Sequence, residues 1–344
     1  MILYLKKENL NIIDNDVLDR CSIKIVTIAS YGNIFRVLWG QFILPVIARM
    51  ENLSILFCPG NISPMIRTTP IKSQWIATIG PFSKDVYFGL SLSEKLLMVI
   101  NKYFILFSGY TSNVVIHESR YSQNLFEDKY KYNKDNQYLI ECGKDNFYHY
   151  VSEKPLSDNV ITNISKNDLL CVSHLYPYKN IERLILAFCS KRSDRDDQKL
   201  YIAGKKAFPD YFASLEKLVC DHDLEKRIIF TGMVNKNELR YAYSRCKLFV
   251  FPSLCESSGY TLIEAMSCGS PILASDRTAI PYTCNDAAEY FDAYSKDDLQ
   301  KKLQNLLSDP DKLLNMKKKS ISRSEEMIDY KAATNQFIEI VNKK

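Results

Sequence analysis

Residues 248–275 read LFVFPSLCESSGYTLIEAMSCGSPILAS, and this stretch decides the fold. Its opening run, Leu248–Phe251, has the length and aromatic content of a buried strand. A Ser-rich loop follows, and from Tyr260 apolar residues recur at helical spacing as far as Gly269, a residue type common at helix C-termini. A second apolar run covers residues 272–274. Strand, loop, helix and strand in this order predict a parallel α/β sheet.

Two carboxylates accompany the N-terminus of this predicted helix. Glu256 is in the loop and Glu264 is on the helix, while Ser257, Ser258 and Gly259 lead from Glu256 into the helix. Unpaired backbone N–H groups and the helix dipole make such an N-terminus an anion site. This order suits a nucleotide sugar: the loop carboxylate could bind the sugar, the anion site the diphosphate, and the helix carboxylate the ribose. The alternative interpretation is a capped helix that carries two solvated glutamates.

The same stretch resembles the nucleotide-sugar motif of retaining glycosyltransferases of the GT-B fold, glycosyltransferase family 4 in particular. That motif has the form P-S-x-x-E-x-F-G-x-x-x-x-E-A-M-x-x-G-x-P. The positions that match it are Pro252, Ser253, Glu256, Gly259, Glu264, Ala265, Met266, Gly269 and Pro271. One position departs from the motif, because Ser258 stands where Phe is usual.

A second match lies upstream, where residues 173–180 read SHLYPYKN and resemble the family's G-R-L-x-x-x-K-N. Lys179 matches the lysine that neutralises the donor diphosphate. His174 stands where arginine is usual. Arginine has a fixed charge and a planar fork of donors, whereas histidine titrates near neutrality. A solvated residue at a helix start is the alternative for Lys179, which the Glu256–Glu264 pair further along the chain disfavours. For His174 a purely structural role stays open.

The resemblance implies an α/β chain of two Rossmann-like domains that face a cleft. We expect an acceptor-side domain over residues 1–150 and a nucleotide-sugar-binding domain over residues 167–330. Residues 151–166 are polar and aperiodic, and we interpret them as the interdomain linker. Residues 331–344 are expected to form a helix that crosses back to the first domain, as in this fold.

The first domain resembles the family only in part. Residues 33–60 match its R-x-L-W-x-Q-x-x-L-P helix and the P-G that ends the following strand. The residues before them contain no glycine-rich loop, so the family's first strand, that loop and its first helix are expected to be absent. The run Trp75–Ile79 also ends without the His-Asp or Arg-Asn pair that faces the acceptor in the family.

The resemblance implies transfer of a sugar from a nucleotide-diphosphate donor to a glycan or lipid-linked acceptor, with retention, in cell-surface polysaccharide synthesis. Glu256 would contact the donor sugar and Glu264 the ribose, while Lys179 and backbone N–H groups stabilise the leaving diphosphate. The donor-binding residues are His174, Lys179, Ser258, Gly259, Tyr260, Thr261 and Glu264, and the catalytic residues are Glu256 and Lys179. The scheme uses no metal and no cofactor besides the nucleotide sugar itself.

Composition places the chain among globular proteins of a reducing compartment. Hydrophobic residues make up 46% and charged residues 25% of the 344 residues, an ordinary balance for two domains. The ten cysteines form no C-x-x-C pair and no zinc spacing, which favours the cytoplasm. A net charge of +5, with no Lys/Arg run longer than Lys317–Lys319, does not indicate a nucleic-acid partner.

Two apolar segments predict contact with a membrane surface. Residues 34–50 and 96–107 are rich in large apolar side chains and flanked by basic residues, which suits a peripheral helix on anionic lipid. Burial in the core of the first domain is the alternative. We therefore expect a cytoplasmic protein at the inner face of the membrane.

Two other functions stay open. The missing glycine-rich loop and acceptor-side pair would also fit a catalytically inactive GT-B-like remnant or a partner subunit. The mildly basic composition leaves nucleic-acid binding as the second alternative.

Overall fold

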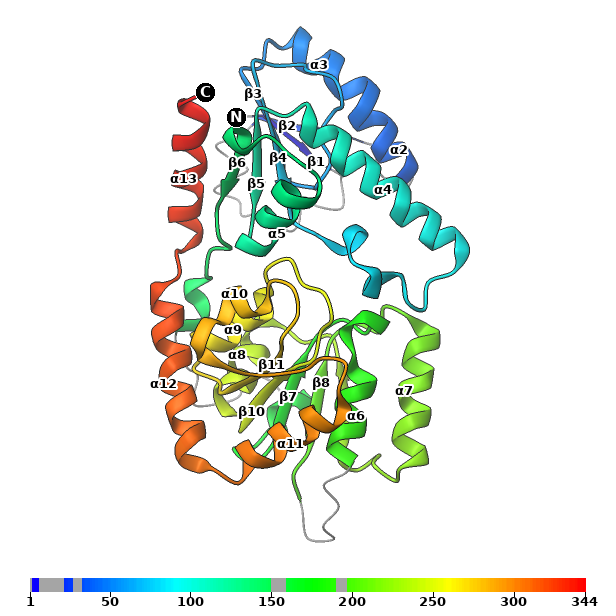
Figure 1. Cartoon of the computed structure of the whole chain (residues 1–344), viewed down its shortest axis with the longest axis vertical. Helices are drawn as coiled ribbons and strands as arrows, with labels where there is room; N and C mark the ends of the chain where they lie inside the picture. Colours follow the sequence, from blue (N-terminus) through cyan, green and yellow to red (C-terminus); the bar gives the residue numbers. More distant parts are fainter. Residues whose placement is uncertain (1, 6–21, 27–32, 150–158, 190–196) are drawn as a thin grey trace.

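The computed structural model describes residues 2–5, 22–26, 33–149, 159–189 and 197–344. Within them the chain forms two α/β domains, one above the other in Figure 1, and each is built on a purely parallel sheet. The two Rossmann-like domains expected from the resemblance are thereby confirmed.

The first domain is organised around a four-stranded parallel sheet in the order β3–β4–β5–β6. Its strands are β3 (Ile55–Cys58), β4 (Ile71–Ile76), β5 (Val114–His117) and β6 (Gln137–Leu139). Its helices are α2 (Asn33–Leu38), the π-helical turn η3 (Trp39–Ile43), α3 (Leu44–Met50), α4 (Leu92–Tyr110) and α5 (Arg120–Asn124). β5 is buried along its whole length, as expected for a central parallel strand.

The second domain has a six-stranded parallel sheet in the order β12–β11–β10–β7–β8–β9. The strands are β7 (Leu169–Val172), β8 (Leu200–Ala203), β9 (Ile228–Gly232), β10 (Leu248–Phe251), β11 (Ile272–Ser275) and β12 (Ala288–Phe291). β7 and β10 are neighbours although β8 and β9 lie between them in the chain, so the strand order reverses there. Such a switch point is where doubly wound sheets bind ligands, beyond the carboxyl ends of the strands.

Helices cover both faces of this second sheet. The first group is α6 (Ile181–Cys189), α7 (Pro209–Asp221), α11 (Lys296–Leu307) and α12 (Pro310–Glu326), which share one hydrophobic core. The second group is α8 (Lys236–Arg245), α9 (Tyr260–Ser267) and α10 (Ile280–Cys284), which share the other. Because both faces are covered, the four central strands are buried throughout.

The chain passes between the domains at two places. After β6, the side chains of Cys142 and Tyr148 already belong to the core of the second domain, as do Ile161 and Ile164. At this first crossing the chain therefore leaves the first domain before residue 150, and part of the segment expected to be a linker is buried in the second domain.

The second crossing is made by α13 (Tyr330–Asn342), which packs on the sheet of the first domain (Figure 1). Ala333 and Val341 share a core with strand β5, and the Phe337 ring lies 4.7 Å from that of Phe57 on β3. Apolar contact thus holds the last helix against a domain formed mainly by the start of the chain.

The expected absence of a first strand, a glycine-rich loop and a first helix is not confirmed. β1 (Ile2–Leu5) and β2 (Ser22–Ile25) form a parallel pair ahead of α2. Residues 6–21 and 27–32, where the missing loop and helix would be sought, lie outside the described residues.

Candidate active site

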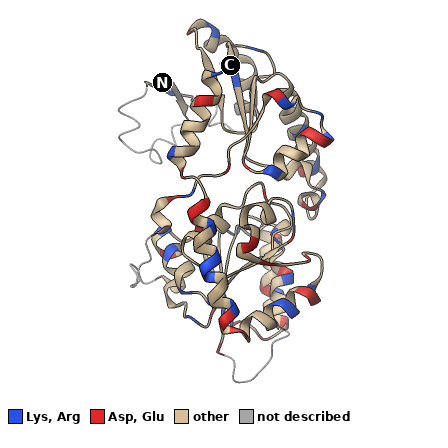
Figure 2. Ribbon diagram, turned by 60° about the vertical axis from the view of Figure 1, so that its left-hand side comes forward, with Lys and Arg blue, Asp and Glu red and all other residues tan. Residues whose placement is uncertain are grey.

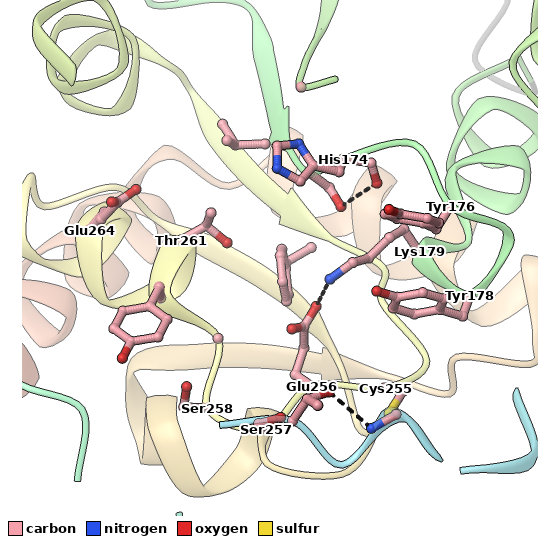
Figure 3. Close-up of a pocket in the computed structure, with 18 of the residues that line it drawn as sticks. His174, Tyr176, Tyr178, Lys179, Cys255, Glu256, Ser257, Ser258, Thr261 and Glu264 are labelled. Atoms are coloured by element: carbon pink, nitrogen blue, oxygen red, sulfur yellow. Dashed lines mark hydrogen bonds and ion pairs between the residues drawn. The ribbon is translucent and has the colours of Figure 1, made fainter. Parts of the chain in front are cut away.

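A cavity of about 500 Å³ lies between the two domains, at the carboxyl ends of β7 and β10 (Figure 3). All eight residues that the sequence analysis assigned to the site line it: His174, Lys179, Glu256, Ser258, Gly259, Tyr260, Thr261 and Glu264. Ala77, Thr78, Gly80 and Val86 reach it from the first domain. The switch point of the sheet and the facing domain thus enclose one site.

Lys179 and Glu256 point toward each other in this cavity (Figure 3). The Lys179 Nζ atom lies 2.5 Å from the Glu256 Oε1 atom, and the two side chains are only 14% and 13% exposed. Burial alone would lower the pKa of Lys179, but the Glu256 carboxylate raises it above its usual value. Lys179 therefore stays cationic and can form an ion pair with an anion that enters the cavity.

The N-terminus of α9 is open toward the cavity. Several other helices begin with a capping side chain, as α8 does at Asn235 and α13 at Asp329. The N-cap of α9 is Gly259, which has no side chain to occupy the first-turn N–H groups. Its φ of +85° is a left-handed conformation that favours glycine, and an added Cβ would lie 2.9 Å from the Leu262 Cδ1 atom. The backbone N–H groups of this helix start line the same cavity as Lys179, and such groups can bind an anion.

Glu264 lies at the far end of the cavity from Glu256, with Thr261 between them (Figure 3). Its Oε2 atom accepts a hydrogen bond from the Tyr243 hydroxyl at 3.1 Å. Burial raises the pKa of Glu264, while hydrogen bonds from Tyr148 and Tyr243 partly oppose that shift. The carboxylate is thus oriented by tyrosines and retains lone pairs for ligand hydroxyl groups.

His174 lines the cavity as a neutral residue. Its Nδ1 atom accepts a hydrogen bond from the Lys205 backbone N–H at 3.2 Å. Burial lowers the pKa of His174, and the charges of Lys179 and Lys205 lower it further. Unlike the arginine usual at this position, His174 adds no positive charge near pH 7.

Some residues of the site gave no signal in the sequence. Tyr176 and Tyr178 stack with ring centroids 5.6 Å apart, and the Lys179 Nζ atom lies 5.0 Å from the centre of the Tyr178 ring. Ser258 provides no aromatic ring at the position where the family motif has Phe. The rings of Tyr176 and Tyr178 instead lie beside the Lys179–Glu256 pair and help to shield it from solvent. Both tyrosines belong to the segment SHLYPYKN, but no sequence pattern predicts that they lie near Glu256, which is distant in the chain.

Two domains built on parallel sheets that enclose a cavity at their interface are characteristic of the GT-B fold. Residues 154–323 match the family described as "Glycosyl transferases group 1". The second domain of this chain therefore belongs to that family.

Curated relatives match over less than half of this chain. The serotype-specific mannosyltransferase WbdA of Escherichia coli is 30% identical over 142 residues, which is 41% of this chain and 17% of that protein. The O-antigen chain mannosyltransferase RfbU of Salmonella typhimurium strain LT2 is 30% identical over 155 residues, which is 45% of this chain and 42% of that protein. This chain thus spans less than half the length of these two relatives.

Solved structures share the fold over nearly the whole chain. Anabaena Alr3699/HepE in complex with UDP-glucose superposes with a TM-score of 0.72 at 16% identity, covering 100% of this chain and 99% of that one. Sucrose-phosphate synthase from Thermosynechococcus elongatus gives a TM-score of 0.72 at 17% identity, covering 99% and 88%.

Proposed function

We propose that this protein transfers a hexose from a nucleoside-diphosphate donor to a glycan or lipid-linked acceptor, with retention at the anomeric carbon. The Lys179–Glu256 pair beside the open N-terminus of α9 carries the proposal, because it supplies a cation for a diphosphate and a carboxylate for sugar hydroxyls. The relatives WbdA and RfbU are named mannosyltransferases, which favours mannose among hexoses and cell-surface polysaccharide as the product.

In this scheme the bond between the anomeric carbon and the β-phosphate oxygen breaks while charge develops on the leaving diphosphate. Lys179 and the N–H groups of Gly259, Tyr260 and Thr261 stabilise that charge, and Glu264 holds the ribose. The acceptor hydroxyl attacks from the face that the diphosphate leaves, and its proton passes to the diphosphate oxygen. Glu256 fixes the sugar and has no role as a proton acceptor.

A nucleotide-sugar binding panel followed by a transfer assay tests this function. UDP-, GDP- and dTDP-hexoses should each be assayed by thermal shift, and the donor that stabilises most should then be assayed for sugar release and transfer. We expect stabilisation in the wild type and its loss in Lys179→Met. Binding without any sugar release would favour the inactive remnant, and no nucleotide binding would contradict both.

The acceptor is proposed to lie at a membrane surface. In the first domain, apolar side chains of η3, α3 and α4 are exposed to an unusual degree, with Phe42 at 69%, Val46 at 54% and Leu96 at 60%. Figure 1 shows these helices on the side of the domain away from α13. Lys95 and Arg49 are exposed on the same helices, as suits anionic lipid.

We propose that the protein is peripheral and binds the cytoplasmic face of the membrane. Among the described helices, none combines the length and apolar character needed to cross a bilayer. On the side drawn in Figure 2, Lys and Arg are interspersed with Asp and Glu over both domains, which does not favour a nucleic-acid surface.

A further inference from the structure

Three residues of the first domain, Ile79, Glu118 and Ser119, meet two of the second, Ser257 and Ser258, beside the cavity. The Ser119 hydroxyl donates to the Ser257 carbonyl at 2.5 Å, and the Ile79 backbone N–H donates to the Ser257 hydroxyl at 3.0 Å. Next to them, the Ser258 hydroxyl donates to the Glu118 Oε2 atom at 3.2 Å. The first domain therefore binds the loop that leads into the N-terminus of α9.

Glu118, which follows directly after β5, is the charged member of this contact. It is 5% exposed, and its Oε1 atom accepts hydrogen bonds from the Trp75 indole at 2.8 Å and the Tyr260 hydroxyl at 3.4 Å. With Ser258 on Oε2, the carboxylate has donors from both domains, and each of these donors is neutral. A buried carboxylate held only by neutral groups depends on every one of its hydrogen bonds.

The pKa of Glu118 agrees with that geometry. Burial raises the pKa above its ordinary value, and the donors Trp75, Cys142, Ser258 and Tyr260 each lower it again. Losing the two donors of the second domain would leave a buried carboxylate with fewer partners. The hydrogen bonds across the interface therefore stabilise Glu118 and the contact between the domains together.

The bound loop is also the loop that faces the donor. Residues 256–261 line the cavity, and Gly259 stands between the two residues that bind Glu118. The sequence departs from the family motif at Ser258, and the serine hydroxyl supplies one of these hydrogen bonds. A phenylalanine there could not donate to a carboxylate.

We propose that Glu118 is a positioning residue for sugar transfer, which fixes the donor loop against the acceptor-side domain through Ser258 and Tyr260. This inference rests on the proposed function. The second domain holds the same loop independently, because the Glu256 backbone N–H donates to the Thr278 hydroxyl at 2.9 Å and the Thr283 hydroxyl donates to the Ser258 carbonyl. Loss of Glu118 should therefore leave the nucleotide site formed and misplace it relative to the acceptor.

The kinetic test compares Glu118→Gln and Ser258→Ala with the matched control Tyr294→Phe. Tyr294 also bridges the domains, through a 2.7 Å hydrogen bond to Asp85, and neither of these two residues belongs to the donor loop. We expect kcat to fall about tenfold or more in Glu118→Gln and Ser258→Ala, and Kd for UDP or GDP in Glu118→Gln to stay within about twofold of the wild type. The double variant should be no slower than Glu118→Gln, because both changes remove the same hydrogen bond between Ser258 and Glu118.

A spectroscopic test needs no turnover. The chain has two tryptophans, Trp39 and Trp75, so Trp39→Phe assigns the indole ¹H–¹⁵N signal of Trp75 in tryptophan-labelled protein. Ser258→Ala, although it lies in the other domain, should shift the Trp75 signal through Glu118, and Tyr294→Phe should not. Added UDP or GDP should shift the signal in the wild type and leave it unchanged in Glu118→Gln.

Several results would overturn the role of Glu118. They are a kcat of Glu118→Gln within about twofold of the wild type, nucleotide affinity that falls in parallel with kcat, or a Trp75 signal indifferent to Ser258→Ala. If the wild type itself binds nucleotide without transferring sugar, the proposed function fails. The indole shifts would still decide whether Glu118 links the domains, so the two failures are distinguishable.

Discussion

Lys179 and Glu256 are 77 positions apart in the chain, yet their side chains form a nearly buried ion pair at the centre of the interdomain cavity. Each belongs to the loop after one of the two strands, β7 and β10, at which the sheet reverses its order. The fold therefore brings together the cation that we assign to the diphosphate and the carboxylate that we assign to the sugar.

Lys179→Met should weaken binding of the nucleoside diphosphate far more than that of the nucleoside. The diphosphate should lose about 1.5–3 kcal/mol, the usual range for a hydrogen bond to a charged group. The nucleoside carries no charge for Lys179 to offset, so its affinity should be nearly unchanged. Isothermal titration calorimetry with both ligands measures the difference, and equal losses would mean that Lys179 only supports the fold.

Glu264→Ala should reduce affinity for the bare nucleoside diphosphate, by about 1–3 kcal/mol, because ribose hydroxyls lose their buried acceptor. Tyr243→Phe is the matched control, since it keeps the carboxylate and removes the hydrogen bond that orients it. Its effect should have the same direction and be smaller. If Glu264→Ala binds the nucleoside diphosphate as tightly as the wild type, the ribose does not bind at Glu264.

Glu256→Ala should show the opposite behaviour, with nearly normal binding of bare nucleoside diphosphate and no measurable turnover. The reason is that Glu256 is assigned to the sugar, which the bare nucleotide lacks. Calorimetry combined with the transfer assay separates the two carboxylates, and the reverse pattern would exchange their roles.

The first domain should lose stability in acid through His117. This residue is fully buried, and burial lowers its pKa from 6.5 to about 3. The unfolded chain therefore binds a proton at a higher pH than the folded one, so the contribution is complete above pH 6.5 and lost as pH falls toward 3. Between pH 7 and 5 the loss should be about 2 kcal/mol.

Urea unfolding at both pH values measures this loss, because Trp39 and Trp75 both report on the first domain. In His117→Gln the difference in unfolding free energy between pH 7 and pH 5 should shrink by about the same amount. An unaltered difference would show that other groups govern the acid response.

Vesicle binding should depend on the apolar side chains of the first domain. Phe42→Asp combined with Leu96→Asp should abolish sedimentation with anionic vesicles, and Lys95→Glu should weaken it in a salt-dependent way. Leu314→Asp, at an equally exposed apolar position on α12, is the matched control and should bind normally. If the wild type stays in the supernatant with fully anionic vesicles at low salt, the acceptor is not at a membrane.

Local patterns predicted the second domain well. The unit of residues 248–275 forms β10, α9 and β11 because its apolar residues are contiguous in the strands and helically spaced between them. The cavity-lining residues from 256 to 264 could be predicted for the same reason, since loop, helix N-terminus and carboxylates are adjacent in the chain. What could not be predicted depends on how the two domains meet.

Glu118 illustrates that limit. In the sequence it is one glutamate after a strand, and its three bonded neighbours Trp75, Ser258 and Tyr260 come from distant segments. The neutral state of His174 is a similar case, because burial and the nearby lysines set its pKa and neither is visible in residue spacing. Residues 142–149 also looked like the end of the first domain, but Tyr148 packs in the second.

The return of α13 to the first domain determines the order in which the protein can be completed during synthesis. The second domain has all its strands and covering helices once α12 has left the ribosome. The first domain, although translated earlier, still exposes the apolar surface around Phe57, Val114 and Ile116 that Phe337, Ala333 and Val341 later cover. During synthesis, part of the core of the first domain therefore stays exposed to water until the last helix has left the ribosome.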